Sequence, residues 1–306
     1  MFKAVSSSSA KIFDYLFLKF LSEKTKNKVE VIILMTAIAS FIIHLGLIFL
    51  VDFGFLQISE TAGLFKNPIT AIYTPFSFIL IYEVYLLIYY LPKSITVYIG
   101  KQYEIMTLIL IRRLFKDLSH LQLTSDWFSV KGDIAFTFDL LATVILFVLI
   151  LVFYSLNPQK DEKTKIVPEL SKATTLFIRM KNWIATLLVP ILVVIASYSL
   201  FDWLNRNFFN SSPITSGAPQ LDGIFFDHFF TILILADVLL LLISFLRTDR
   251  FSTVIRNSGF VISTILIKVS FGTEPILNSV LVVVAVLFGV IILAIEKRYD
   301  RLGLKS

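Results

Sequence analysis

Residues 133–156 read DIAFTFDLLATVILFVLILVFYSL, and their only charged side chains are Asp133 and Asp139 near the start. A helix needs about 20 apolar residues to cross the hydrocarbon core of a bilayer, and this run is longer than that. Seven more apolar runs lie along the 306-residue chain, at 31–52, 70–92, 94–115, 182–204, 224–246, 251–271 and 276–296. The sequence therefore predicts an all-α fold, a polytopic transmembrane helical bundle with about eight spans.

The composition agrees with a membrane protein. Apolar residues make up 57% of the chain, charged residues only 16%, and the mean hydropathy is +0.83, whereas soluble domains are about 25% charged.

The sequence carries no signal for catalytic or metal chemistry. Cysteine is absent, which excludes disulfides, cysteine metal sites and thiol nucleophiles. The sequence also lacks a phosphate-binding loop, a Gly-x-Ser-x-Gly elbow and an HExxH metal motif. We therefore expect no enzyme activity, no metal and no cofactor.

The run 94–115 is the one whose placement is ambiguous, because Lys101, Glu104 and Arg112 would also suit a helix lying flat on the membrane. With a cytoplasmic N-terminus and eight spans, 21 of the 28 Lys and Arg residues lie inside and 7 outside. Laying this run and its counterpart in the second half on the surface changes the count to 17 inside and 11 outside. Cytoplasmic loops are enriched in Lys and Arg, so we predict that 94–115 crosses the membrane.

The chain divides into four predicted parts: a cytoplasmic amphipathic N-terminal segment (1–29), a first four-helix membrane unit (30–157), a basic cytoplasmic linker (158–181) and a second four-helix membrane unit (182–306). The net charge is +6, and the positive charge is in loops beside apolar spans. Anionic lipid headgroups are the nearest binding partner there. We expect an integral protein of the bacterial inner (plasma) membrane that binds no nucleic acid. A homo-oligomer or a membrane-protein partner is left open.

The two predicted units resemble each other. Residues 106–112 (MTLILIR) align with residues 262–268 (ISTILIK), 156 residues further on. Each unit has a span, an outside loop, a span with one carboxylate (Glu83 or Asp237), a short basic turn, a helix ending in a cation, and a last span. This order favours a parallel duplication. The alternative is that any two apolar helices ending in a basic residue align equally well.

Several of these stretches carry a family resemblance. Residues 82–88 (YEVYLLI), the turn at 97–100 (VYIG) and the run ending in Arg112 resemble the core of the phosphate-starvation-inducible PsiE family of four-helix membrane proteins. In the second half Asp237, residues 259–268 and residues 296–298 are similar in order and spacing, so the likeness covers about 180–230 residues. The chain departs from the family in the longer stretch between Gly100 and Arg112 and in having Asp for Glu. The resemblance implies a membrane fold in tandem duplicate.

Glu83 lies near the middle of an apolar span, where a charge costs about 2.5–3.5 kcal/mol, so it should face the bundle interior and a partner. Lys101, Glu104 and Arg112 follow each other at helical spacing, which indicates one polar stripe. In a strict hairpin with a 1.5 Å rise, Lys101 is level with Glu83, and Arg112 lies about 13 Å further along. We therefore predict that Glu83 pairs with Lys101, with Gln102 as the alternative partner, and that Arg112 lies near the outer interface.

Three other residues complete the candidates. Asp237 is a second intramembrane carboxylate, Lys268 ends the matching helix, and His44 in the first span could bond across helices or relay protons. The full set of candidate ion-pathway residues is Glu83, Lys101, Glu104, Arg112, Asp237, Lys268 and His44. One hypothesis is ion or proton movement, or sensing of membrane stress. The alternative is a non-catalytic scaffold or interaction subunit whose polar groups only hold the bundle together.

Overall fold

A computed structural model describes residues 13–55, 71–118, 131–157, 172–204, 221–245 and 251–302. Within these ranges all regular secondary structure is helical, which confirms the predicted all-α class for the described part. After helical residues 13–20 come α2 (Glu23–Asp52), α3 (Tyr73–Tyr90), α4 (Ile95–Leu118), α5 (Lys131–Leu156), α6 (Lys172–Leu204), α7 (Leu221–Phe245), α8 (Phe251–Ser270) and α9 (Pro275–Arg301). Of the predicted linker 158–181, residues 158–171 lie outside the described ranges and the remainder belongs to α6.

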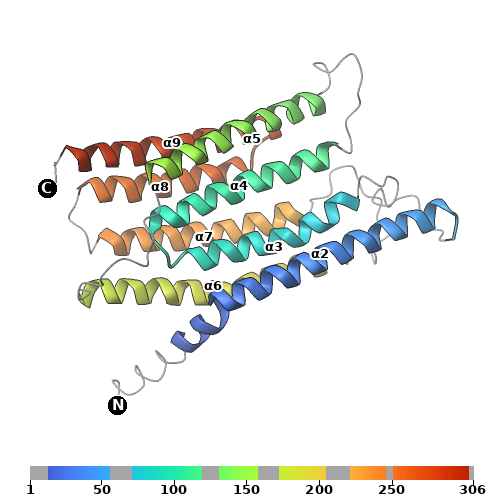
Figure 1. Ribbon diagram of the computed structural model, residues 1–306, viewed down its shortest axis with the longest axis horizontal. Coiled ribbons are helices and arrows are strands. Elements are labelled where there is room, and N and C mark those ends of the chain that lie inside the picture. The colour runs from blue at the N-terminus through green and yellow to red at the C-terminus, as the bar shows by residue number, and fades with distance from the viewer. Residues whose placement is uncertain are drawn as a thin grey trace.

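The helices lie side by side, and α2 to α9 run in alternating directions along a common long axis (Figure 1). Each helix packs on its sequence neighbour within α2–α5 and within α6–α9. The two sets of four meet where α9 packs on α5, α6 packs on α3, and α4 touches both α8 and α9. Helix α4 therefore contacts helices of both halves and lies at the centre of the bundle.

Local chemistry explains several helix boundaries. Ser22 caps α2, because its hydroxyl accepts a hydrogen bond from the backbone N–H of Thr25 at 3.2 Å. At the turn before α4, Ser94 Oγ accepts from the backbone N–H of Val97 at 3.3 Å. Pro275 opens α9, where its missing N–H costs nothing. The cap also explains why α2 begins at residue 23, ahead of the apolar run.

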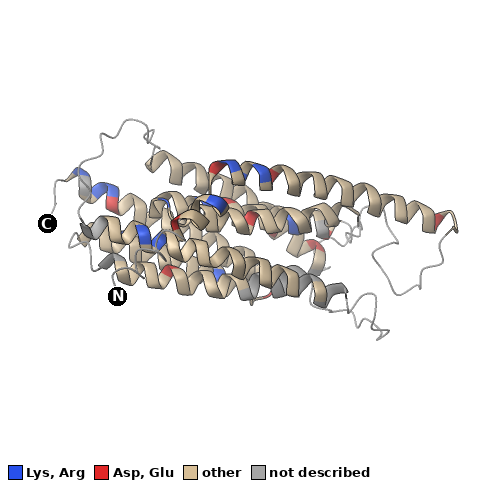
Figure 2. Cartoon of the chain, turned by 90° about the horizontal axis from the view of Figure 1, so that it is seen from below, with Lys and Arg blue, Asp and Glu red and all other residues tan. Residues whose placement is uncertain are grey.

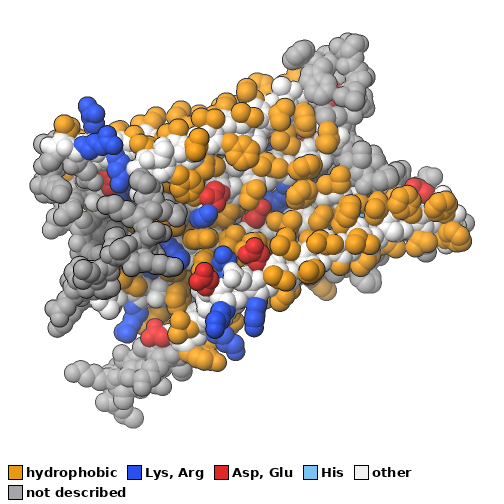
Figure 3. Space-filling model, viewed as in Figure 1, with side chains coloured by type: hydrophobic (Ala, Val, Ile, Leu, Met, Phe, Trp, Pro, Cys, Tyr) orange, Lys and Arg blue, Asp and Glu red, His pale blue; other side chains and the backbone are white. Residues whose placement is uncertain are grey.

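Among the described residues, four helices are long and apolar enough to cross a membrane: Glu23–Asp52, Gly132–Leu156, Thr175–Tyr198 and Pro275–Tyr299. Their surroundings differ, since 44% of the apolar window in α9 is buried inside the bundle but only 11% of that in α2. The outer face of α2 is lined with exposed apolar side chains, including Val31, Ile32, Met35 and Ile42. Figure 3 shows this apolar surface continuing along α2 away from its start. In water such a surface drives association, whereas it suits the hydrocarbon of a bilayer.

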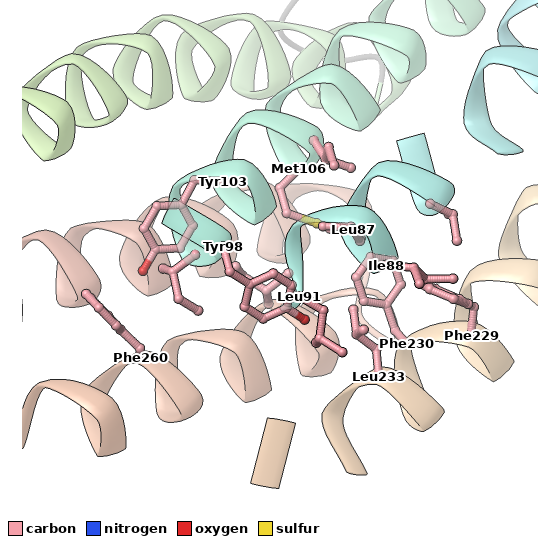
Figure 4. Close-up of a cluster of buried hydrophobic side chains, with 14 of the residues drawn as sticks. Leu87, Ile88, Leu91, Tyr98, Tyr103, Met106, Phe229, Phe230, Leu233 and Phe260 are labelled. Atoms are coloured by element: carbon pink, nitrogen blue, oxygen red, sulfur yellow. The ribbon is translucent and has the colours of Figure 1, made fainter. Parts of the chain in front are cut away.

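The core lies around α4. Tyr103 and Met106 from α4 pack with Leu87 and Ile88 from α3 and with phenylalanines from the second half (Figure 4). Tyr103 fits because residue 289 on α9 is a glycine, and a Cβ there would overlap the Tyr103 hydroxyl. The hydroxyl also hydrogen-bonds to Ser263 Oγ of α8 at 2.8 Å. A close approach of α9 thus fixes the centre of the bundle.

Candidate functional site

Buried polar side chains form two groups along α4. The first, which we call the ion-pair layer, comprises Glu83, Arg112, Arg113, Asp139, Asn278 and Ser279. The second, which we call the Asp237 cluster, comprises Asp237, Gln102, Thr264 and Tyr98. Since α4 runs from Ile95 to Leu118, the Asp237 cluster lies toward its start and the ion-pair layer toward its end.

In the ion-pair layer, Arg112 of α4 is paired with Glu83 of α3. Arg112 Nη2 lies 3.1 Å from Glu83 Oε2, and both residues are no more than 5% exposed. Arg112 Nη1 also donates to the backbone carbonyl of Phe76 at 3.4 Å. A buried ion pair keeps both charges off the hydrocarbon, and losing one partner leaves the other uncompensated.

The predicted Glu83–Lys101 pair is therefore wrong, as is the placement of Arg112 near the outer interface. In a helix every side chain leans toward the helix N-terminus. Because α3 and α4 are antiparallel, Glu83 leans away from the turn between them and Arg112 leans toward it. The side chains of Glu83 and Arg112 therefore extend toward each other across the offset of about 13 Å between their backbones. The side chains of Glu83 and Lys101 extend in opposite directions, away from each other.

Lys101 instead pairs with Glu104 on its own helix, at 2.7 Å, and the two side chains are 26% and 34% exposed. Tyr154 of α5 donates its hydroxyl to Glu104 Oε1 at 2.5 Å. The predicted polar stripe of α4 is thus not one interior face. Leu108, between Glu104 and Arg112, is 45% exposed, so the neighbours of this face change along the helix.

Arg113 joins three helices, and sequence reasoning missed its role. Its Nε and Nη2 each lie 2.5 Å from an oxygen of Asp139 on α5. It also donates to Asn278 Oδ1 at 2.9 Å and to Ser279 Oγ at 2.6 Å, both on α9. Asp139 is fully buried and also accepts from Ser279. The sequence signal that could have predicted this contact is a basic residue, Arg113, and an acidic residue, Asp139, in adjacent apolar runs.

The Asp237 cluster is buried, and within the described part of the chain it has no ion pair. Gln102 Nε2 donates to Asp237 Oδ2 at 3.2 Å, and Gln102 Oε1 accepts from the Thr264 hydroxyl at 2.8 Å. Asp237 Oδ1 and the Tyr98 hydroxyl are buried without a hydrogen-bond partner among the described residues. No described Lys or Arg lies within 4.0 Å of this carboxylate. The positive charge of Lys181 interacts with the Asp237 carboxylate only at longer range. The Lys181 ammonium donates a hydrogen bond to the backbone carbonyl of Lys93 at 2.8 Å.

The remaining candidates lie apart from both groups. His44 of α2 lies 2.5 Å from the Thr74 hydroxyl of α3, a contact between neighbouring helices. Lys268 is in the last turn of α8, half-buried and one turn beyond Thr264. Asp133 is in the first turn of α5 and is buried. These three residues belong to neither the ion-pair layer nor the Asp237 cluster.

The chemistry open to the two groups differs. Among the described residues no group of three or more His, Asp or Glu side chains could hold a metal ion. The ion-pair layer holds its acids and bases in contact, which suits a structural clamp. The Asp237 cluster combines one acid with neutral donors and acceptors, which suits the binding and release of a proton.

Comparison with known proteins gives no match: no family model, no curated protein and no solved structure is similar to this chain. The resemblance to the PsiE family stays a prediction.

Proposed function

We propose that this integral membrane protein moves protons across the bilayer, and that Asp237 is the group that binds and releases them. One observation carries the proposal: a carboxylate that is only 5% exposed, inside an apolar bundle, with no ion-pair partner among the described residues. An intramembrane acid of this kind marks a functional site more often than a structural one.

The surroundings of Asp237 suit both protonation states. In a closed, dry bundle an uncompensated charge is costly, so the carboxyl group takes up a proton. When water reaches the site, the ionised form is stabilised by the Gln102 amide, which already donates to it, and by the adjacent Tyr98 hydroxyl. Asp237 is eight residues before the end of α7, about 12 Å along the helix, so a short aqueous path from that end suffices.

The proposal includes the finer topology. Eight spans with a cytoplasmic N-terminus in the bacterial inner membrane are supported by the alternating directions of α2 to α9 (Figure 1) and by the distribution of basic residues. In Figure 2 Lys and Arg concentrate in the half of the molecule that contains both termini.

Two parallel four-helix repeats, which the PsiE resemblance implies, are supported by the equivalent packing order of α2–α5 and α6–α9. In both units a glycine of the third helix faces the fourth. A Cβ at Gly100 would lie 2.9 Å from Tyr154 Oη, and one at Gly259 would lie 2.7 Å from Ile292 Cγ2. Neither approach tolerates a larger residue without movement of the neighbour.

Labelling tests the topology. Ser94→Cys and Lys116→Cys, made separately in this cysteine-free chain, place one thiol near each end of α4. An impermeant maleimide added to right-side-out vesicles should label Lys116→Cys and spare Ser94→Cys. Labelling of both from the same side would rule out a crossing by α4.

Proton flux tests the function. The purified full chain is reconstituted into phosphatidylcholine liposomes with an internal pH-sensitive dye, and a pH gradient is imposed with valinomycin and potassium clamping the voltage. Wild type should dissipate the gradient faster than empty liposomes, and Asp237→Asn should return the rate to background. Asp52→Asn is the matched control, since Asp52 is an exposed carboxylate at the end of α2, and its flux should equal that of wild type. Background flux in wild type, or full flux in Asp237→Asn, would refute the proposal.

A non-catalytic scaffold is the second candidate, and the ion-pair layer favours it. The layer joins α3 to α4 and α4 to α5 and α9 through contacts that are already complete. In a scaffold Asp237→Asn would change only thermal stability, and flux would equal background in every variant.

A further inference from the structure

Basic and aromatic side chains gather where α2 starts and where α3 turns into α4. Lys26 of α2 lies 5.8 Å from the centroid of the Tyr89 ring, and Lys93 of the turn lies 5.4 Å from the same centroid. Both distances are within the range of a cation–π contact. We call Lys26, Tyr89 and Lys93 the α2–α3 basic site. Figure 3 shows charged side chains gathered near the start of α2.

The two ammonium groups of this site lack an acidic partner. Neither Lys26 nor Lys93 forms an ion pair in the described part of the chain. Of the nearby carboxylates, Glu104 binds Lys101 and Tyr154, and Glu30 accepts from Tyr82 at 2.7 Å. Glu23, at the start of α2, acts on the Tyr89 ring but forms no ion pair with Lys26 or Lys93 among the described residues. Two cations held on one ring without a carboxylate in contact repel each other, so an anion between them would stabilise the arrangement.

We infer that the α2–α3 basic site binds the phosphate headgroup of an anionic phospholipid. Tyrosine and lysine at this level of a helical bundle are typical of the membrane interface. The exposed apolar side chains of Val31 and Leu34 begin on the next turns of α2, where an acyl chain attached to that headgroup would lie. A soluble phosphate would gain nothing from this apolar surface. The charge and the apolar face together favour a lipid, independently of any role of Asp237.

Native mass spectrometry of the full chain, from detergent containing equal amounts of phosphatidylglycerol and phosphatidylcholine, tests this inference. Wild type should retain phosphatidylglycerol preferentially. A basic residue near a membrane surface contributes about 1 kcal/mol, so Lys93→Gln should lower the preference about fivefold, and Lys26→Gln/Lys93→Gln more than tenfold. Tyr89→Phe keeps the ring and should bind like wild type.

The matched control is Arg298→Gln/Arg301→Gln, which removes two cations from the last turn of α9. It should leave the preference unchanged, and an equal loss there would show general charge attraction and overturn the site. Unchanged binding in the double lysine variant would also overturn it. Lys93 is exposed in a turn, so Lys93→Gln remains informative if the double variant fails to fold. Displacement of the lipid by inorganic phosphate would assign the site to a soluble anion and refute the lipid.

Discussion

The ion-pair layer and the Asp237 cluster bury polar groups in the same bundle by opposite means. In the ion-pair layer each buried carboxylate has a guanidinium in contact, with Glu83 on Arg112 and Asp139 on Arg113. In the Asp237 cluster the carboxylate has only neutral neighbours within bonding distance among the described residues. A compensated acid holds helices together, whereas an uncompensated acid costs stability and is retained where it has a task. This difference distinguishes the structural contacts of the ion-pair layer from the proton-binding role that we propose for Asp237.

Breaking the ion-pair layer should have the largest effect on stability. Arg112→Met leaves Glu83 buried without its cation, which should cost about 3–5 kcal/mol of unfolding free energy. Thermal unfolding in detergent measures the loss. The double variant Glu83→Leu/Arg112→Met removes both charges and should recover most of it. A double variant as unstable as the single one would mean that the two residues are not coupled.

The close contact between α4 and α9 at Tyr103 and Gly289 should give the next largest effect. Gly289→Ala places a methyl group where the Tyr103 hydroxyl lies, and overpacking of this kind costs about 1–3 kcal/mol. Gly46→Ala is the control, because nothing lies within 4 Å of a Cβ at that position in α2. It should be neutral or slightly stabilising, since alanine favours helices. Equal behaviour of the two variants in thermal unfolding would contradict the close approach of α9.

Asp237→Asn should change stability by less than about 1 kcal/mol, because no ion pair is lost and an uncompensated acid is removed. Asp139→Asn, in the ion-pair layer, exchanges an equally small atom group and should cost several times more. Comparing the melting temperatures of the two variants tests whether the ion-pair layer and the Asp237 cluster differ in their contribution to stability. A larger loss of stability in Asp237→Asn than in Asp139→Asn would contradict that difference.

Lys101→Gln should have the smallest effect, about 0.5 kcal/mol or less, because its pair with Glu104 is partly exposed and lies on one helix. Had Lys101 been the partner of Glu83, the loss would approach that of Arg112→Met. Thermal unfolding of the two single variants side by side therefore tests the pairing found in the structure.

Sequence reasoning succeeded where a property depends on residues close together in the chain. Helical class follows from the apolar runs, and α4 at Ile95–Leu118 lies close to the predicted 94–115. Asp237 and Glu83 were singled out because each is a charge in an apolar run. The spacing predicts Gln102 only as an alternative partner of Glu83, whereas the fold places it between Asp237 and Thr264, because α4 contacts helices of the second half.

The sequence by itself determined that this chain is helical and apolar, and which acids interrupt its apolar runs, because these properties depend on composition and local spacing. Only the tertiary structure decided how the acids are partnered. Glu83 finds Arg112 because antiparallel helices direct these two side chains toward each other, and Arg113 finds Asn278, 165 residues away in the sequence, because α9 packs beside α4 and α5. Whether a buried charge is compensated depends on which helices become neighbours, and no short stretch of sequence encodes that.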